Sequence, residues 1–261
     1  MLVDWSPGYR EYAPPAALGA GVSCLWVRVV PAGEVEQAPV LPDGCADLIW
    51  QGGRGVFVAG PDTGPAPSAL APGTVFAGAR LRPGAGGPAL GMPLSALLDQ
   101  RVDAADLAGE AGGGPAIDLA RLLPGWVTPV AAMRGLAGIA GRMVAAGPPD
   151  PLVMETARRL GSPRARVEDL AADLGVSERH LYRRCRAAVG YGPATLRRVL
   201  RFRRFVSRID QAASLDLARL ATEAGYADQA HLTRESTRLA GLPPAALARA
   251  RRPARADDQC D

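Results

Sequence analysis

A thiol stands between two carboxylates in the stretch LPDGCADLIW, residues 41–50, where Cys45 is two positions from both Asp43 and Asp47. Paired carboxylates can act as a general acid and base, and a thiolate can act as a nucleophile or a metal ligand. The same stretch also predicts a plain structure, because Pro-Asp-Gly is typical of a turn and the apolar residues after it are typical of a buried strand. The rest of the chain has to decide between these interpretations.

Both histidines of the chain, His180 and His231, lie in its C-terminal half. Cys45 therefore lacks the usual base for nucleophilic catalysis and the usual companion ligand for a metal. The cysteines are spread over the chain without a CxxC pair, which fits reduced thiols better than disulfides or a structural zinc site. They are Cys24, Cys45, Cys185 and Cys260. We expect no catalytic residue, no metal and no cofactor.

Two interpretations of Cys45 stay open. Free cysteines usually pack as small hydrophobic residues, but a cysteine can also line a pocket or sense oxidants. Trp26 and Trp50 are expected in the core, although aromatic side chains also line cavities for apolar ligands. Arg80 is expected either to pair with Asp47 at the surface or to bind an anionic ligand. The candidate effector pocket therefore consists of Trp26, Cys45, Trp50 and Arg80.

The periodicity of apolar residues predicts the elements that position these side chains. In the N-terminal half it predicts strands at 23–30, 46–50, 55–59 and 75–81, followed by helices at 94–100, 115–123 and 130–145. Glycine runs at 84–87 and 112–114 are expected to form loops, and neither has the spacing of a nucleotide-binding loop.

Positive charge is concentrated in the second half of the chain. Residues 1–150 carry 9 Arg and 13 acidic residues, for a net charge of −4, whereas residues 151–261 carry 21 Arg and 13 acidic residues, for a net charge of +8. This segregation suggests that the second half meets a polyanion. The N-terminus lacks the basic start and apolar run of a signal peptide, and no stretch of about 18 apolar residues follows. We expect a soluble, cytoplasmic protein without a membrane partner.

The basic half contains an internal repeat, in which residues 167–193 align with residues 215–244. Leu-Ala pairs, glycines and prolines of the first copy recur 50 or 51 positions later. Each copy has an apolar stripe at helical spacing, a glycine, a capping residue (Ser177 or Asp228) and a second amphipathic segment that ends at another glycine. Each copy is typical of a helix-turn-helix motif.

The outward face of each second helix carries side chains suited to DNA. Arginine matches O6 and N7 of guanine, glutamine matches adenine, and the first turns of a recognition helix reach base edges in the major groove. A solvated surface would explain one such helix, but two in repeat within a basic segment favour DNA binding. The expected DNA-contacting residues are Arg179, Tyr182, Arg183 and Arg186 in the first copy and Gln229, Thr233, Arg234 and Arg238 in the second.

The segment between the copies, PATLRRVLRFRRFVSRI at 193–209, predicts one long helix with an apolar side and an arginine-rich remainder. At 1.5 Å per residue its length would be about 24 Å. Such a helix would hold two recognition helices apart, for successive major-groove segments about 34 Å from each other.

Residues 152–252 resemble the DNA-binding domain of the AraC/XylS family of transcription regulators. The similarity lies in LAADLGVSERHLYRRCRAAVGYGP and in AGYADQAHLTRESTRLAGLPP. The resemblance implies two helix-turn-helix motifs around a connecting helix, with DNA-reading positions at Arg179, Tyr182 and Arg183 and at Gln229, Thr233 and Arg234. Cys185 and Ser236 stand where the family usually buries an aromatic residue, which predicts looser packing beneath both recognition helices.

Residues 9–109 are similar, in stretches such as YREYAPP and VAGPDT, to the N-terminal domain of some members of this family. In the wider family this half binds an effector or mediates dimerisation, and the resemblance implies the same here. It also makes double-stranded DNA, RNA polymerase, a small-molecule effector and a second copy of the chain the expected partners. Two alternatives stay open: an enzyme domain at 1–150 that carries a DNA-targeting module, and a nucleoid-type structural protein.

We expect an α+β fold with two domains. Glycine and prolines at 146–151 interrupt two helical patterns and are typical of a linker. The expected order is a β-rich regulatory domain at 1–145, the linker at 146–151, an all-α DNA-binding domain at 152–252 and a disordered tail at 253–261.

Overall fold

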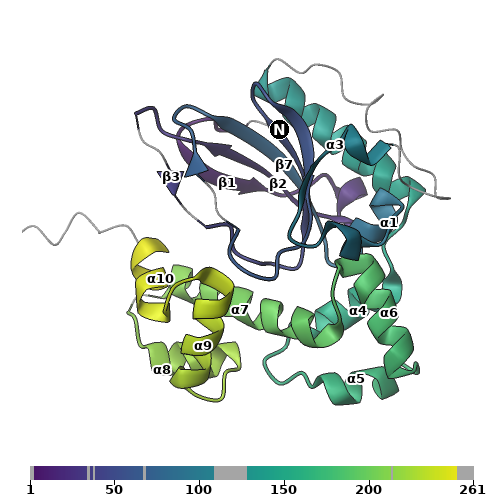
Figure 1. Cartoon of the computed structure of the whole chain (residues 1–261), viewed down its shortest axis with the longest axis vertical. Coiled ribbons are helices and arrows are strands. Elements are labelled where there is room, and N and C mark those ends of the chain that lie inside the picture. The colour runs from purple at the N-terminus through teal and green to yellow at the C-terminus, as the bar shows by residue number, and fades with distance from the viewer. Residues whose placement is uncertain are drawn as a thin grey trace, which may run out of the picture.

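The computed structural model describes residues 3–33, 36–37, 39–66, 69–108, 128–212 and 214–251. The helix expected at 115–123, the glycine run at 112–114 and the tail at 253–261 lie outside the described residues. Figure 1 shows a β-sheet with a long helix beside it in the N-terminal part, and a group of helices in the C-terminal part. The fold is α+β, as the sequence predicts.

The main sheet has six antiparallel strands in the order β1-β2-β7-β4-β5-β8. Its strands are β1 (Gly8–Tyr12), β2 (Val22–Val29), β4 (Ala46–Gln51), β5 (Gly55–Ala59), β7 (Val75–Leu81) and β8 (Arg101–Asp103). A separate ribbon pairs β3 (Glu36–Gln37) with β6 (Ala69–Leu70). The four predicted strands are confirmed to within one residue at each end. The short strands β1 and β8 were not predicted.

The two faces of the sheet have different surroundings. Helix α3 (Pro129–Ala146) covers one face, and its apolar residues share a core with alternate residues of β4, including Leu48 and Trp50. Asp47 and Ile49 alternate with these residues and point to the opposite face, where Trp26 forms a smaller cluster. Strand alternation thus places the polar part of β4 away from α3.

Short helical turns connect the strands: η1 (Ala16–Leu18), α1 (Gly86–Leu90), η2 (Leu94–Leu97) and η3 (Asp106–Ala108). Two predictions were wrong here. The helix expected at 94–100 is only the 3-10 turn η2, and β8 begins shortly after it. The glycine run at 84–87 is only partly a loop, because α1 begins inside it. Gly87 is needed there because a Cβ would collide with the carbonyl oxygen of Ala187 in the C-terminal half.

Seven helices form the described C-terminal part: α4 (Pro151–Leu160), α5 (Val167–Asp173), α6 (Glu178–Val189), α7 (Pro193–Gln211), α8 (Leu217–Ala224), α9 (Gln229–Ala240) and α10 (Pro244–Arg251). Their shared core includes Phe202 and Phe205 of α7, both fully buried. Helix α7 connects the α5–α6 pair to the α8–α9 pair (Figure 1). In the described part of the chain, no helix is both long and apolar enough to cross a membrane.

Asp150 ties the two halves together where they meet. Helix α3 ends at Ala146 and α4 begins at Pro151, so the connection is four residues long. The Asp150 carboxylate accepts hydrogen bonds from the first N–H groups of α4 at 3.0 and 3.2 Å and pairs with Arg184 of α6 at 2.6 Å. The Asp150 N–H donates to the Gly84 carbonyl at 2.9 Å. A single residue therefore caps α4 and contacts both halves.

Candidate nucleic-acid interface

Helices α5 and α6 form the first helix-turn-helix unit. Gly175 provides the turn between them with a φ of 67°. The Ser177 hydroxyl accepts a hydrogen bond from the His180 N–H at 3.2 Å, and Gly190 ends α6 with a φ of 98°. These φ angles lie in the left-handed region, which favours glycine. The predicted cap and the predicted glycine stop of the first copy are confirmed.

Helices α8 and α9 repeat this arrangement. Gly225 ends α8 with a φ of 91°. The Asp228 carboxylate accepts a hydrogen bond from the His231 N–H at 2.6 Å, and Gly241 ends α9 with a φ of 69°. An anionic cap at this position also complements the positive end of the helix dipole. Helices α6 and α9 are thus equivalent elements on either side of α7.

The candidate DNA-contacting side chains lie mainly in solvent. The exposed ones are Arg179, Tyr182, Arg183 and Arg186 on α6 and Gln229, Arg234 and Arg238 on α9. Tyr182 is 52% exposed although its ring also contacts the backbone of Gly192. Thr233 is half-buried, and its hydroxyl donates to the Gln229 carbonyl at 2.9 Å. Each helix therefore presents an exposed polar face with arginine side chains that a ligand can reach.

The opposite faces of α6 and α9 are buried. Leu181 and Leu232 occupy equivalent places in the core, as do Cys185 and Ser236, and all four are almost fully buried. The Ser236 hydroxyl donates a hydrogen bond to the Leu242 carbonyl at 2.7 Å. Burial of a hydroxyl without a partner would destabilise the fold, and this bond removes that penalty. The looser packing expected beneath these helices stays a prediction.

A polar cluster that the sequence did not predict holds α9 against α7. The Arg201 guanidinium lies 4.5 Å from the centre of the Tyr226 ring, and its Nη2 is 3.3 Å from Nε2 of His231. Glu235 of α9 pairs with Arg198 of α7 at 3.1 Å. Burial, and then the charge of Arg201, lower the pKa of His231. In the sequence, Arg198 and Arg201 looked like solvated residues. Their partners on α9 and in the turn before it come close only because the chain bends back after α7.

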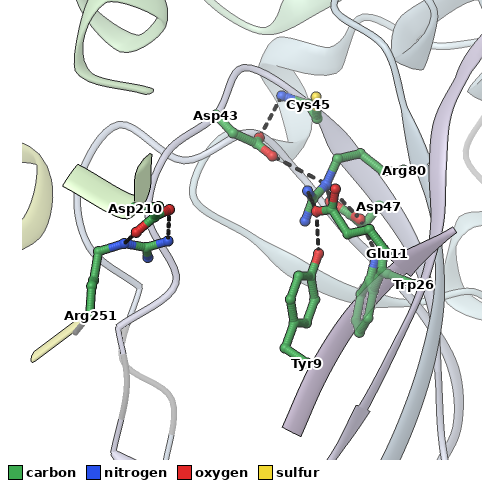
Figure 2. Close-up of polar contacts among 9 residues, drawn as sticks. All are labelled: Tyr9, Glu11, Trp26, Asp43, Cys45, Asp47, Arg80, Asp210 and Arg251. Carbon is green, nitrogen blue, oxygen red and sulfur yellow. Dashed lines mark hydrogen bonds and ion pairs between the residues drawn. The ribbon is translucent and has the colours of Figure 1, made fainter. Parts of the chain in front are cut away.

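A second polar cluster lies on the sheet face away from α3 (Figure 2). Arg80 of β7 pairs with Glu11 at 2.8 Å, with Asp43 at 3.2 Å and with Asp47 at 3.3 Å. The Trp26 indole N–H donates to Asp47 at 2.6 Å. These four charged groups carry a formal charge of −2, and Arg80 is only 22% exposed. The expected pairing of Arg80 with Asp47 is present, within a larger and more buried network.

The structure brings together only part of the candidate effector pocket. Trp26 and Arg80 both contact Asp47, and the Cys45 N–H donates to Asp43 at 2.9 Å (Figure 2). Trp50 instead points to the α3 side and packs in the main core. Cys45 is buried, and burial followed by the nearby Asp43 charge raises the pKa of its thiol well above the usual value. The chemistry of Cys45 in the folded protein is that of a neutral thiol.

The acidic residues of this cluster surround a guanidinium rather than a space for a metal. Within the described ranges, no three or more His, Cys, Asp or Glu side chains are arranged to hold a metal ion. Arg80 lies among Glu11, Asp43 and Asp47 in Figure 2.

Figure 2 also shows Asp210 of α7 paired with Arg251 of α10. The two hydrogen bonds of this pair, at 2.7 and 2.8 Å, hold the last described helix against the connecting helix.

One loop of the N-terminal half, residues 61–65, reaches both helix-turn-helix units. A Cβ placed on Gly190, at the end of α6, would lie 2.7 Å from Pro61. At the end of α9, a Cβ placed on Gly241 would lie 3.6 Å from Pro65. A bidentate pair between Asp62 and Arg101, at 2.7 and 2.9 Å, anchors the loop to β8. The 61–65 loop therefore contacts the C-terminal ends of α6 and α9 while it is anchored to the edge strand β8.

Comparison with protein families gives two matches. Residues 170–250 match the family described as a helix-turn-helix domain. Residues 10–103 match the family described as a domain of unknown function (DUF6597). The first match spans α5 to α10 from Leu170 onward, and the second spans the sheet from β1 to β8.

Two solved structures align with this chain at low sequence identity. ToxT from Vibrio cholerae O395 is 9% identical, with a TM-score of 0.47, and the alignment covers 86% of this chain and 96% of that one. The C-terminal domain of AraT, a response regulator from Geobacillus stearothermophilus, is 19% identical, with a TM-score of 0.38, and covers 42% of this chain and 94% of that one. No curated protein sequence matches this chain significantly.

Proposed function

We propose that the chain is a transcription regulator of the AraC/XylS type, which reads its operator with the helix-turn-helix domain that the family comparison finds at 170–250. Helices α6 and α9 act as two recognition helices that enter successive major-groove segments of one duplex. The observation that supports this proposal is the repeated geometry: two capped helices expose arginine-rich faces from either end of α7. With 19 residues, α7 is about 28 Å long at 1.5 Å per residue, which suits groove segments about 34 Å apart.

The proposed contacts divide by position along each helix. Arg179, Tyr182 and Arg183 lie in the first two turns of α6, where recognition helices approach base edges. Gln229, Thr233 and Arg234 occupy the corresponding part of α9. Arg186 and Arg238 come later in each helix, where contacts to phosphate rather than to bases are expected. The first six residues would therefore determine sequence preference, and the last two would add affinity.

We further propose that residues 1–145 control the DNA-binding domain at 152–252 through the linker at 146–151 and the 61–65 loop. The support for this proposal is that one loop contacts the ends of both recognition helices. A small-molecule effector or a second copy of the chain would act on the N-terminal domain, with Trp26, Cys45 and Arg80 as candidate pocket residues on its outer sheet face. RNA polymerase is the proposed partner at the promoter.

Selection from a random duplex library with the full chain tests the proposal. A defined motif of two half-elements should emerge, with affinity that falls steeply as salt rises because each phosphate contact releases counterions. Arg183→Ala should reduce specificity at one half-element, and Arg234→Ala at the other, by about 1–3 kcal/mol per lost base contact. Arg134→Ala, on the exposed side of α3, is the matched control and should bind like the wild type.

Two outcomes would contradict the proposed mode of DNA recognition. If Arg183→Ala and Arg234→Ala weakened selected and random duplexes equally, these arginines would be phosphate contacts and not base-reading residues. If all duplexes bound with the same affinity, the alternative of a nucleoid-type protein would be favoured. The alternative of an enzyme domain is disfavoured because residues 1–150 contain no histidine that could act as a catalytic base.

A further inference from the structure

A small pocket lies beside α7, between the two helix-turn-helix units. Arg197, Arg201 and Arg204 of α7 form one wall, and Ser162, Ala165 and Gly225 are among the residues that complete it. Ser162 and Ala165 belong to the segment before α5, and Gly225 is the turn before α9. The pocket has a volume of about 30 Å³. A single water molecule needs roughly 10–15 Å³ of cavity volume, so this pocket has room for a small ion but not for a drug-sized molecule.

The pocket is positively charged because three guanidinium groups line it and none of the described residues that line it is acidic. Among the described residues, Arg197 makes one long hydrogen bond, from Nη1 to the Ala165 carbonyl at 3.4 Å. Arg204 donates to the carbonyl of Ala224 at 2.6 Å and to the carbonyl of Gly161. Backbone carbonyls satisfy donor groups but carry no net charge. The hydrogen bonds of Arg197 and Arg204 therefore leave their positive charges uncompensated.

The side chain of Arg201 is only 12% exposed. Its Nη2 is 3.7 Å from Glu235, but the same carboxylate is closer to Arg198, at 3.1 Å. The Arg201 Nε is buried and has no hydrogen-bond partner among the described residues. Burial and the proximity of Arg201 also lower the pKa of Arg204. The single carboxylate of Glu235 thus lies near two guanidinium groups, those of Arg198 and Arg201. The positive charge of α7 therefore exceeds what this carboxylate can neutralise.

We propose that this pocket binds a small tetrahedral oxyanion such as phosphate. Guanidinium groups bind phosphate oxygens through paired, charge-assisted hydrogen bonds, and an anion among three of them would offset their mutual repulsion. The anion would contact the segment that leads into α5 on one side and the turn before α9 on the other. Binding would therefore fix the relative position of the two helix-turn-helix units.

Titration of the full chain with sodium phosphate, against sodium chloride at equal ionic strength, tests the site without any DNA. Calorimetry should show saturable binding of phosphate, and thermal unfolding should show a rise in Tm that chloride does not produce. Arg197→Gln should raise the Kd for phosphate at least tenfold. Arg203→Gln removes the same charge from an exposed position of α7 and should leave the Kd unchanged. Within the described part of the chain Arg197 has one weak partner, so its variant is expected to fold.

Equal effects of phosphate and chloride, or an unchanged Kd in Arg197→Gln, would overturn the proposal. Arg201→Gln gives a second test with the same expected loss, and circular dichroism of that variant verifies its fold. The phosphate could be a free ion or a phosphate of the DNA backbone. Repeating the titration on the protein–duplex complex distinguishes these sources, because bound DNA excludes free phosphate only when a backbone phosphate occupies the pocket. Failure of DNA binding would leave the titration of the free protein unaffected.

Discussion

Asp99 fastens the 61–65 loop through Thr63. Its carboxylate accepts hydrogen bonds from the Thr63 N–H at 2.7 Å and from the Thr63 hydroxyl at 2.8 Å, while the Asp99 N–H donates to the Pro61 carbonyl at 3.0 Å. Asp99 has a φ of 58°, the sole positive φ of a non-glycine residue in the described part of the chain. Asp99, which positions the loop between the two halves, thus keeps an energetically unfavourable backbone conformation.

Asp99→Ala should therefore weaken the loop and lower the free energy of unfolding by about 2–3 kcal/mol, since it removes two hydrogen bonds and alanine tolerates a left-handed φ less well than aspartate. Asp99→Gly removes the same bonds but tolerates the φ, so its loss should be smaller by about 1 kcal/mol. Urea unfolding of both variants measures these differences. Equal stability of the two variants would show that the left-handed backbone is not strained at Asp99.

Gly190 and Gly241 offer a matched pair for the contact between the loop and the recognition helices. Alanine at either position would have to adopt a left-handed φ, which is unfavourable by about 1–2 kcal/mol. At Gly190 the new Cβ would also lie 2.7 Å from Pro61, whereas at Gly241 it would lie at an ordinary 3.6 Å from Pro65. Gly190→Ala should therefore destabilise the protein by about 1–3 kcal/mol more than Gly241→Ala.

The control for this pair is Gly175→Ala, where φ is 67° and no atom lies near the added Cβ. Its stability loss should equal that of Gly241→Ala in thermal or urea unfolding. If Gly190→Ala were no worse than this control, the 61–65 loop would not press on the end of α6. The proposed route of control from the N-terminal domain would then lose its main support.

Local patterns in the sequence were enough to predict most elements. Short apolar runs between turn signals located β4 and β7, and the spacing of apolar residues with a cap and a glycine located α6 and α9. These signals work because each depends on neighbours a few residues away. The strands β1 and β8 are short and half-exposed, so they lack an alternation strong enough to predict them.

Contacts between distant segments could not be predicted in the same way. Trp26 reaches Asp47 across the intervening strand β7, because Gly78 leaves room where any Cβ would collide with the indole ring. Strand order and register decide this contact, and neither follows from the sequence of one strand. The same limit applies to Trp50, which was expected with Trp26 but lies on the other face of the sheet.

The described cysteines should resist alkylation in the native protein. Burial raises the pKa of Cys24 and of Cys185 to about 12 and raises that of Cys45 as well, so thiolate is scarce at pH 8. Iodoacetamide treatment followed by peptide mass spectrometry should find these three positions unmodified until the protein is unfolded. Affinity for the selected duplex should not change. Rapid modification of Cys45 with loss of DNA binding would instead identify it as a sensor.

Asp47 should make the stability of the N-terminal domain depend on pH. Burial, and then the charge of Asp43, raise its pKa to about 6 from 3.8, although Arg80 and Trp26 act in the opposite direction. The folded protein thus holds this proton more tightly than the unfolded chain. The contribution of Asp47 to stability is therefore greatest below pH 3.8 and is lost as pH rises through 6.

Asp47→Asn tests this sign because asparagine keeps an acceptor for the Trp26 indole and does not ionise. A shift of about two pH units corresponds to at most about 3 kcal/mol. Relative to the wild type, the variant should gain stability by up to that amount between pH 4 and pH 7, as measured by urea unfolding at matched ionic strength. A difference that stays constant with pH, or that shrinks as pH rises, would mean that Arg80 dominates and that Asp47 is an ordinary paired carboxylate.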